Sequence, residues 1–415
     1  MNLYLFNAND TAAIYGIGTY LRELTYALID TAINIHIVHL HSVHSEFEII
    51  KTDQVENWYI PEVRNDNTFS GPAQKVEGYL WYVIDLLCLH IKDTRDLVFH
   101  FNYNLHQLLA RELKAIFNCK TVHTVHFLRW TLEFQGNIYR LHALKAKPED
   151  QMTRYEKSTY ATYKYESQLL KEVDRLIVLS NNMNNLLCSE YQINPKKISI
   201  IPNGLNDISK PVHDSNALRK KWLPSDKEFV ILFAGRLHPV KGLQFLITAF
   251  RKVLETIPNC RLMVAGNGND EMYLKESVDI STKVTFTGLL DKKELCELYL
   301  IADIGVIPSL YESFGFVAVE MMMHSLSIVA TATSGLNEVV EDGITGLQIP
   351  VIEYPDKVEI DSVQLAEKML FLLQHPDERK RMGTNARKLY ETVYSAEIFR
   401  QNMLDFYRSL NPEQK

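Results

Sequence analysis

The sequence lacks a long hydrophobic run, a paired set of cysteines and an excess of basic residues. A run of roughly eighteen apolar residues is absent, so a membrane-spanning helix is not expected. The five cysteines are odd in number and widely spaced, which excludes a disulfide framework or a zinc knuckle and favours buried thiols in a reducing cytoplasm. The net charge of −7 argues against binding to nucleic acid, because phosphate neutralisation needs an excess of cations.

Signals for export and for two common nucleotide-binding loops are also missing. The first residues have no basic region and no cleavage site, so we expect a strand there and a cytoplasmic protein. Gly16 and Gly18 precede a predicted helix, but a dinucleotide-binding fingerprint needs a third glycine where Leu21 stands. A phosphate loop that ends in Gly-Lys-Ser/Thr does not occur. Both of these nucleotide-binding classes are therefore excluded.

The pattern that is present predicts an α/β protein with parallel sheets, because short apolar runs alternate with amphipathic helical stretches. A chain of 415 residues is too long for one core, and the polar linker that follows Gly204 indicates a boundary between two domains. The predicted strands are 3–6, 35–40, 97–101, 120–125, 176–179, 198–201, 229–233, 262–265, 284–287, 304–307 and 327–330. The predicted helices are 19–28, 76–90, 105–115, 180–188, 243–256, 292–302, 314–324 and 396–410.

Two carboxylates flank the predicted start of a helix after strand 304–307. Glu312 precedes Ser313, a suitable N-cap, and Phe314 begins an apolar helix that carries Glu320 about two turns further on. Such a helix N-terminus suits a phosphate or a sugar hydroxyl. Glu320 needs a partner because an unpaired buried carboxylate is costly, and a ribose diol could supply it. The alternative is a core helix with one salt-bridged glutamate.

A second candidate segment follows strand 229–233. Gly235 and Arg236 end this strand, and Lys241 lies five residues further on, just before a helix. Arginine binds phosphate oxygens bidentately and lysine supplies a compact charge, so the two cations could hold a diphosphate from two sides. Gly266, after strand 262–265, belongs to a Gly-x-Gly turn that could lie beside the same ligand. The alternatives are solvated loop cations and a simple strand-to-helix turn.

Together these motifs resemble those of a large family of retaining glycosyltransferases (family 4-like, group 1). It includes glycogen synthases, sucrose synthases and bacterial mannosyl- and glucosyltransferases. The match rests on the Glu-x7-Glu spacing, the Ser-Phe-Gly-Phe within it and the Gly-Arg-Leu…Lys-Gly segment, and it is weaker in the first half of the chain. It implies the GT-B fold, in which two doubly wound, Rossmann-like domains face each other across a cleft. Residues 1–204 would form the acceptor-side domain and 205–395 the nucleotide-sugar domain, with helix 396–415 crossing back.

The resemblance implies a retaining hexosyltransferase that uses a UDP- or GDP-sugar. Glu312 and the amides of Phe314, Gly315 and Phe316 would bind the sugar, while Glu320 would hold the ribose. The acceptor would be a glycan, a lipid-linked sugar or a peptide, with peripheral membrane contact left open. No metal and no separate cofactor are expected, because no Asp-x-Asp element lies beside the motifs.

In the first half, the resemblance implies that Gly16 and Gly18 contact the donor and that His126 lies near the transferred sugar. Phe127 stands where the family usually has Asp, and a satisfied strand-end histidine is the alternative for His126. The aromatic stretch 129–165 would belong to the acceptor side or form an ordinary packed helix. Four histidines between His36 and His44 are better explained by hydrogen bonds than by a metal. Two rival functions remain open: an inactive scaffold subunit and a sugar-nucleotide epimerase of the same architecture.

Overall fold

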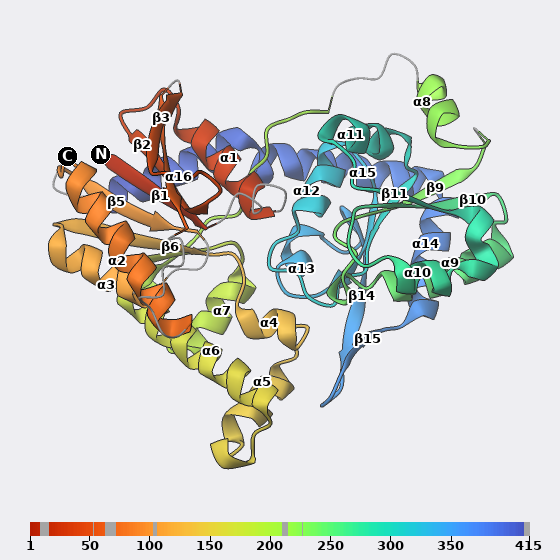
Figure 1. Ribbon diagram of the computed structural model, residues 1–415. Helices are drawn as coiled ribbons and strands as arrows, with labels where there is room; N and C mark the ends of the chain where they lie inside the picture. Colours follow the sequence, from red (N-terminus) through yellow and green to blue (C-terminus); the bar gives the residue numbers. More distant parts are fainter. Residues whose placement is uncertain are drawn as a thin grey trace. The chain divides into compact units, whose positions relative to one another are not determined.

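The computed structural model describes residues 1–8, 16–52, 54–62, 72–102, 106–209, 215–225 and 227–410 (Figure 1). The chain forms two compact units. The first contains residues 1–128, 161–204 and 396–415, and the second contains 129–160 and 205–395. The longer segment of the second unit begins at Leu205, next to the boundary predicted at Gly204. The second unit also takes up residues 129–160, which the sequence analysis placed in the first domain.

The described strands of the first unit form a sheet with the order β3-β4-β2-β1-β5-β6-β7-β8. All neighbours are parallel except β3 and β4, which form an antiparallel pair at one edge. Its strands are β1 (Asn2–Ala8), β2 (Asn34–Ser42), β3 (Glu48–Thr52), β4 (Val55–Pro61), β5 (Leu97–Phe101), β6 (Cys119–Val125), β7 (Arg175–Val178) and β8 (Ile198–Ile200). Its helices are α1 (Gly16–Leu28), α2 (Pro72–His90), α3 (Gln107–Ile116), most of α6 (Arg154–Glu172), α7 (Asn181–Glu190) and α16 (Ala396–Leu410).

The second unit contains a sheet with the order β11-β10-β9-β12-β13-β14-β15, in which only β14 and β15 pair antiparallel. Its strands are β9 (Phe229–Ala234), β10 (Cys260–Ala265), β11 (Val284–Gly288), β12 (Ile304–Ile307), β13 (Ile328–Ala332), β14 (Gly346–Glu353) and β15 (Val358–Ile360). Its helices are α4 (Arg129–Glu133), α5 (Ile138–Ala146), α8 (Ser215–Trp222), α9 (Leu243–Thr256), α10 (Glu271–Glu276), α11 (Lys292–Ile301), α12 (Phe316–Met323), α13 (Leu336–Val339), α14 (Ser362–Gln374) and α15 (Pro376–Leu389).

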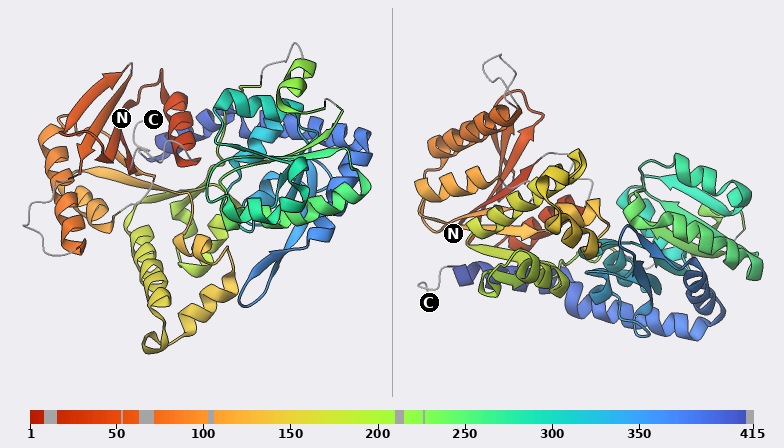
Figure 2. Two further views of the ribbon diagram at one scale, coloured as in Figure 1. Left: turned by 45° about the vertical axis from the view of Figure 1, so that its right-hand side comes forward. Right: turned by 90° about the horizontal axis from the view of Figure 1, so that it is seen from below.

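Burial explains why these segments adopt these elements. The central strand β9 is apolar at every position, as expected for a parallel strand covered on both faces. Helix α9 buries Leu243, Leu246, Ile247, Phe250 and Val253, a spacing of three and four residues that makes one apolar stripe. Helix α9 lies beside α14 (Figure 2), and the residues of the stripe belong to the core of the second unit. The same periodicities underlie the α/β prediction, and the two parallel-dominated sheets confirm it.

Strand order also locates a topological switch point in the second unit. The chain runs from β9 to β10 and β11 on one side, then returns to β12 on the other side of β9. In open parallel sheets, ligands bind outside the carboxyl ends of the strands where the order reverses. The loops that follow β9 and β12 are therefore the first place to look for a ligand site.

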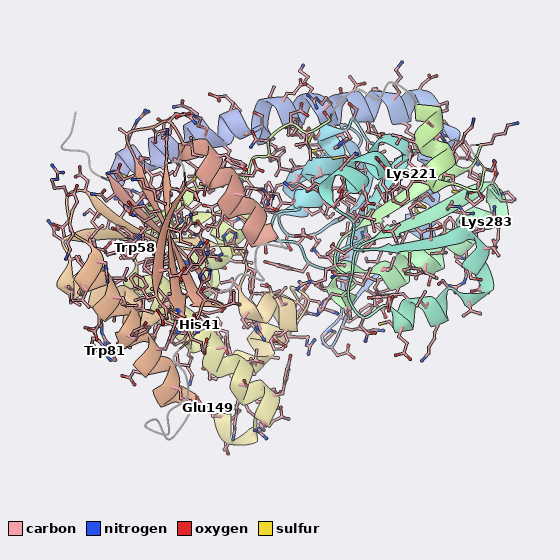
Figure 3. All side chains as sticks on the ribbon, turned by 45° about the horizontal axis from the view of Figure 1, so that its top comes forward. His41, Trp58, Trp81, Glu149, Lys221 and Lys283 are labelled. Carbon is pink, nitrogen blue, oxygen red and sulfur yellow. The ribbon has the colours of Figure 1, made fainter. Side chains whose placement is uncertain are left out.

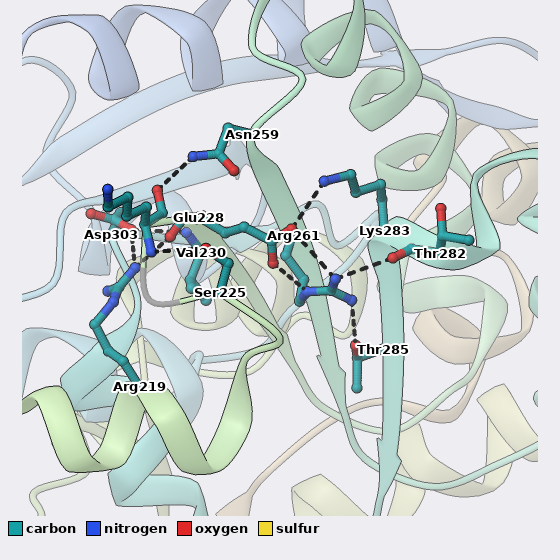
Figure 4. A network of polar contacts seen from close by, with 11 residues as sticks. Arg219, Ser225, Glu228, Val230, Asn259, Arg261, Thr282, Lys283, Thr285 and Asp303 are labelled. Carbon is teal, nitrogen blue, oxygen red and sulfur yellow. Dashed lines mark hydrogen bonds and ion pairs between the residues drawn. The ribbon is translucent and has the colours of Figure 1, made fainter.

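The opposite, amino-terminal edge of this sheet is held by a buried ionic network (Figure 4). The Glu228 carboxylate accepts hydrogen bonds from Arg261 Nε at 2.7 Å and from Lys283 Nζ at 2.9 Å. Arg261 also donates to the Thr285 hydroxyl at 3.1 Å. Only 5% of Glu228 and 7% of Arg261 are exposed. The network therefore links the starts of β9, β10 and β11, at the opposite ends of these strands from the switch point.

Candidate active site

The loop after β9 brings two cations to the switch point. Arg236 is exposed directly after Gly235, and Lys241 closes a short 3₁₀ turn just before α9. Gly242 joins this turn to α9 with φ +69°, and a Cβ there would lie 1.8 Å from the carbonyl oxygen of Pro308. Only glycine permits this close approach between the loops that follow β9 and β12.

The loop after β10 packs against the same segment. The Gly235 amide donates to the carbonyl of Ala265 at 2.9 Å, and the Leu237 amide donates to that of Asn267 at 2.8 Å. Gly266 has φ +146°, and a Cβ there would lie 1.8 Å from the Gly235 carbonyl oxygen. Backbone therefore meets backbone at this point. The Gly-x-Gly turn therefore supports the backbone of the loop that carries Arg236.

The loop after β12 places Glu312 against Lys241, and the two side chains form a half-buried ion pair. Backbone hydrogen bonds fix this loop on both sides. The Leu310 amide donates to the Val240 carbonyl at 2.8 Å, and the Gly335 amide donates to the Glu312 carbonyl at 2.9 Å. Two residues that lie 71 positions apart in the chain are thus in direct contact. The structure brings together the two motifs that the sequence analysis treated separately.

Helix α12 begins later than predicted. Its first residue is Phe316 and its N-cap is Gly315, in the left-handed conformation with φ +107°, so Ser313 does not cap the helix. A non-glycine residue would be strained in this conformation, which explains why the helix starts after the glycine. The amide of Phe316 opens the helix, whereas Phe314 and Gly315 belong to the preceding loop.

Glu320 lies in the second turn of α12, and its carboxylate accepts a hydrogen bond from the Tyr299 hydroxyl at 2.7 Å. Tyr299 comes from α11 and is 3% exposed. Burial, together with the charge of Glu320, raises the pKa of Tyr299 well above its usual value. The sequence analysis expected a partner for Glu320 but did not identify Tyr299. Tyr299 lies 21 residues before Glu320 in the chain, so no local pattern of the sequence indicates this contact.

In the first unit, His126 follows β6 and lies beside α1. Its ring packs edge-on against Tyr20 of α1, with the ring centroids 4.7 Å apart. Burial, with a smaller effect from His123, lowers the pKa of His126 to about 3, so the imidazole is neutral at physiological pH. Within the part of the chain that the structure describes, His126 Nε2 is buried without a hydrogen-bond partner. This nitrogen is therefore suited to meet a polar ligand atom.

Gly16 and Gly18 form the first turn of α1, the helix that carries Tyr20. The preceding part of the predicted loop, residues 13–15, lies outside the described residues. The candidate residues thus fall into two groups. His126 lies near the helix of Gly16 and Gly18 in the first unit, and the other candidates gather at the switch point of the second unit.

Helix α4, which the sequence analysis did not identify, adds a carboxylate to the second unit. Glu133 accepts hydrogen bonds from the Tyr155 hydroxyl at 2.6 Å and from Arg129 Nε at 3.1 Å. It also influences the loop after β9. Burial and the charges of Arg236 and Lys241 lower the pKa of His238, while Glu133 opposes this shift. Glu133, at the start of the aromatic stretch, is therefore close enough to His238 to act on it electrostatically.

The histidines of β2 and the following turn each have a different partner. His36 lies 2.9 Å from a Glu56 oxygen, His41 lies 2.7 Å from Glu62, and His44 lies 3.1 Å from Glu48. Among the described residues, no three His, Cys, Asp or Glu side chains gather as a metal site would require. In the same part of the chain, no helix combines the length and apolar character needed to span a bilayer.

A cavity in the first unit lies away from these candidates. It is found at the amino-terminal edge of the sheet and is lined by Asn2, Asn34, Glu56 and Trp58, among others. Figure 3 labels Trp58, which is 2% exposed. Because the cavity lies at the opposite ends of the strands from His126, it is not part of the candidate active site.

Two family models match the chain and together cover most of it. Residues 14–207 match "Glycosyltransferase Family 4", and residues 214–389 match "Glycosyl transferases group 1". The solved structure of sucrose-phosphate synthase from Thermosynechococcus elongatus is similar over 99% of both chains, with a TM-score of 0.77 and 23% identity. This likeness concerns the fold and confirms the GT-B architecture expected from the sequence.

Curated relatives match over part of their length. An uncharacterized glycosyltransferase of Methanocaldococcus jannaschii is 30% identical over 240 residues, which cover 54% of this chain and 61% of that protein. A D-inositol 3-phosphate glycosyltransferase of a Mycobacterium species is 32% identical over 189 residues, which cover 44% of this chain and 42% of that protein.

Proposed function

Because this chain belongs to the group 1, family 4-like glycosyltransferases, we propose that it moves a hexosyl group from a nucleotide-diphosphate sugar to an acceptor hydroxyl with retention of configuration. The donor would be a UDP- or GDP-sugar, and no divalent metal would take part. The bond between the anomeric carbon and the phosphate oxygen breaks, and a bond to the acceptor oxygen forms on the same face. The acceptor proton passes to the leaving phosphate.

The observation that carries this proposal is the contact between Lys241 and Glu312 at the switch point. It joins a cationic loop and a carboxylate loop at the carboxyl ends of adjacent parallel strands, where ligands bind in such sheets. An ion pair with a purely structural role could lie anywhere in the unit. This pair lies at the switch point, beside the exposed Arg236 and the start of α12. That position suits a ligand with both phosphate and hydroxyl groups.

We assign the diphosphate to Arg236 and Lys241. Negative charge on the departing diphosphate grows as the sugar bond breaks, so nearby cations stabilise the transition state more than the ground state. Gly235 and Gly266 would let the backbone approach the same phosphates. Two protein cations would then provide the charge compensation that a metal gives in other transferases.

The sugar is assigned to Glu312 and to the start of α12, where the backbone of Phe314, Gly315 and Phe316 would face its hydroxyls. The ribose is assigned to Glu320. Acceptor-side residues would come from the first unit. His126, with its neutral ring and buried Nε2, would hydrogen-bond to the transferred sugar, and the helix that starts at Gly16 would contact the donor.

The acceptor is a glycan, a lipid-linked sugar or a peptide in this proposal. We expect the reaction on the cytoplasmic side, with contact to the membrane surface determined by the acceptor. Each of the three acceptor classes presents a nucleophilic hydroxyl, which is all that the proposed chemistry requires of it.

The first experiment measures thermal stabilisation of the chain by UDP, GDP and ADP, because a ligand that binds only the native state raises its stability. Donor turnover is then followed with sugars of the nucleotide that binds. We expect one nucleotide to stabilise the chain and its sugar to be transferred or slowly hydrolysed. Binding without turnover would favour a scaffold, and conversion of the donor to an epimer without any acceptor would favour an epimerase. Either result would contradict the proposal.

A further inference from the structure

Tyr299 is placed to fix the orientation of the Glu320 carboxylate. The tyrosine lies near the end of α11, and its hydroxyl reaches across to Glu320 Oε2 on α12 at 2.7 Å. The contact joins two helices that flank β12, the strand whose carboxyl end carries Glu312.

The hydroxyl acts as a donor at any physiological pH, because burial keeps Tyr299 protonated. A carboxylate can accept about four hydrogen bonds, and one tyrosine supplies only one. Tyr299 thus restricts the rotation of the Glu320 carboxylate, a group that accepts hydrogen bonds from hydroxyl donors. The two hydroxyls of a ribose are donors of the required kind.

His324 contacts both Tyr299 and Glu320. Its ring packs against the Tyr299 ring with the centroids 5.0 Å apart, and its Nδ1 lies 2.8 Å from the Glu320 carbonyl oxygen. The three residues therefore contact one another in a closed triangle. The position of the Tyr299 ring, and with it the direction of its hydroxyl, is fixed by packing.

We propose that Tyr299 is a positioning residue that orients Glu320 to bind the ribose hydroxyls of the donor nucleotide. This inference rests on the proposed function, since it assumes that Glu320 faces a nucleotide. It adds a specificity: the chain would prefer ribonucleotides to 2′-deoxyribonucleotides, and Tyr299 would carry part of that preference.

The test compares Tyr299→Phe with the unchanged chain. Calorimetry measures the affinity for whichever of UDP, GDP and ADP binds, and for its 2′-deoxy form. We expect Tyr299→Phe to weaken binding of the ribonucleotide about tenfold, as for loss of a hydrogen bond to a charged group. Binding of the 2′-deoxy form should weaken less, because only its 3′-hydroxyl remains to bind Glu320. The matched control is Tyr390→Phe, which removes another buried hydroxyl, bonded to the Leu205 carbonyl at 2.9 Å. It should leave both affinities unchanged.

A double variant keeps the test decisive if Tyr299→Phe alone does not fold. Tyr299→Phe combined with Glu320→Gln also removes the charge that loses its hydrogen bond from Tyr299. This double variant should bind the ribonucleotide as Glu320→Gln does alone, because Tyr299 acts through Glu320. Additive losses would overturn the inference, as would a Tyr299→Phe chain that still prefers the ribonucleotide fully. If neither Arg236→Ala nor Glu320→Gln weakens nucleotide binding, the proposed function itself fails.

Discussion

Replacing Lys241 with alanine has two consequences, and the structure separates them. The first is loss of a cation beside the departing diphosphate, which should lower kcat by roughly 10²-fold or more if it resembles the loss of an oxyanion-hole donor. The second follows from the ion pair with Glu312. Without Lys241, the Glu312 carboxylate keeps its charge beside the phosphates and repels them.

The size of this repulsion can be worked out from burial. Side-chain exposure is 23% for Lys241 and 20% for Glu312, so an effective dielectric constant of about 20 is appropriate. Two like charges about 6 Å apart then repel by about 3 kcal/mol, and solvent screening reduces this to about 1–2 kcal/mol. We therefore expect Lys241→Ala to weaken donor binding by roughly 5- to 30-fold in addition to its effect on kcat.

Steady-state kinetics of Lys241→Ala, Glu312→Gln and the double variant measure the coupling. Because the two residues are in contact, the double variant should lose less than the sum of the single losses in kcat/KM. Lys275→Ala and Glu271→Gln form the control cycle, since that exposed pair on α10 should show no coupling. Circular dichroism confirms that each variant is folded. Additive losses at Lys241 and Glu312, or a folded Lys241→Ala chain with near-normal kcat, would refute the reasoning.

Other predictions concern chemistry and stability. EDTA should leave transfer intact; loss of activity restored by Mg²⁺ or Mn²⁺ would contradict this. Proton NMR of fresh product should show the donor's anomeric configuration, and the opposite anomer would exclude retention. Arg236→Lys should lower kcat about as much as Arg236→Ala, because lysine lacks the planar fork. Glu228→Gln should destabilise the fold by about 3–5 kcal/mol in urea titrations, against about 0.5 kcal/mol for Glu271→Gln. Burial alone would raise the pKa of Glu228, but hydrogen bonds from Arg261 and Lys283 lower it. The contribution of Glu228 to the free energy of unfolding should therefore be complete above its unfolded pKa of about 4.5 and should disappear as the pH falls through the folded pKa.

Apolar periodicity predicted much of the scaffold. The strands β9 and β12 were predicted to within one residue at either end. Strand β10 was predicted to begin two residues too late, because Arg261 interrupts its apolar run. The edge pair β3 and β4 was missed because all five residues of β3 are exposed, so no alternation of buried and exposed positions marks it. Helix α12 was predicted two residues too early, because the conformation of Gly315 is decided by its surroundings and not by Ser313.

The candidate site was predictable as two separate motifs but not as an assembly. Arg236, Lys241, Glu312 and Glu320 could be identified because their spacing resembles the motifs of the glycosyltransferase family, and Glu320 also stands out inside an apolar helix. The contact between members of the two motifs depends on strand order, which local sequence does not encode. The contact between Lys241 and Glu312 arises because β9 and β12 are neighbours in the sheet. The roles assigned to these residues stay predictions until the variants are measured.

The segment 129–160 has a consequence for hybrid enzymes made by exchanging halves between relatives. An exchange at Gly204 would follow the linker, yet this segment is encoded before that point and packs within the second unit. Gly136 lies so close to Tyr311 that a Cβ would approach the ring to 2.5 Å, and the Asn137 amide donates to the Tyr354 carbonyl at 2.6 Å. A foreign first half would bring its own residues to both contacts. Compatible parents for such hybrids should therefore be chosen by the fit at Gly136 and Asn137, and not by the linker.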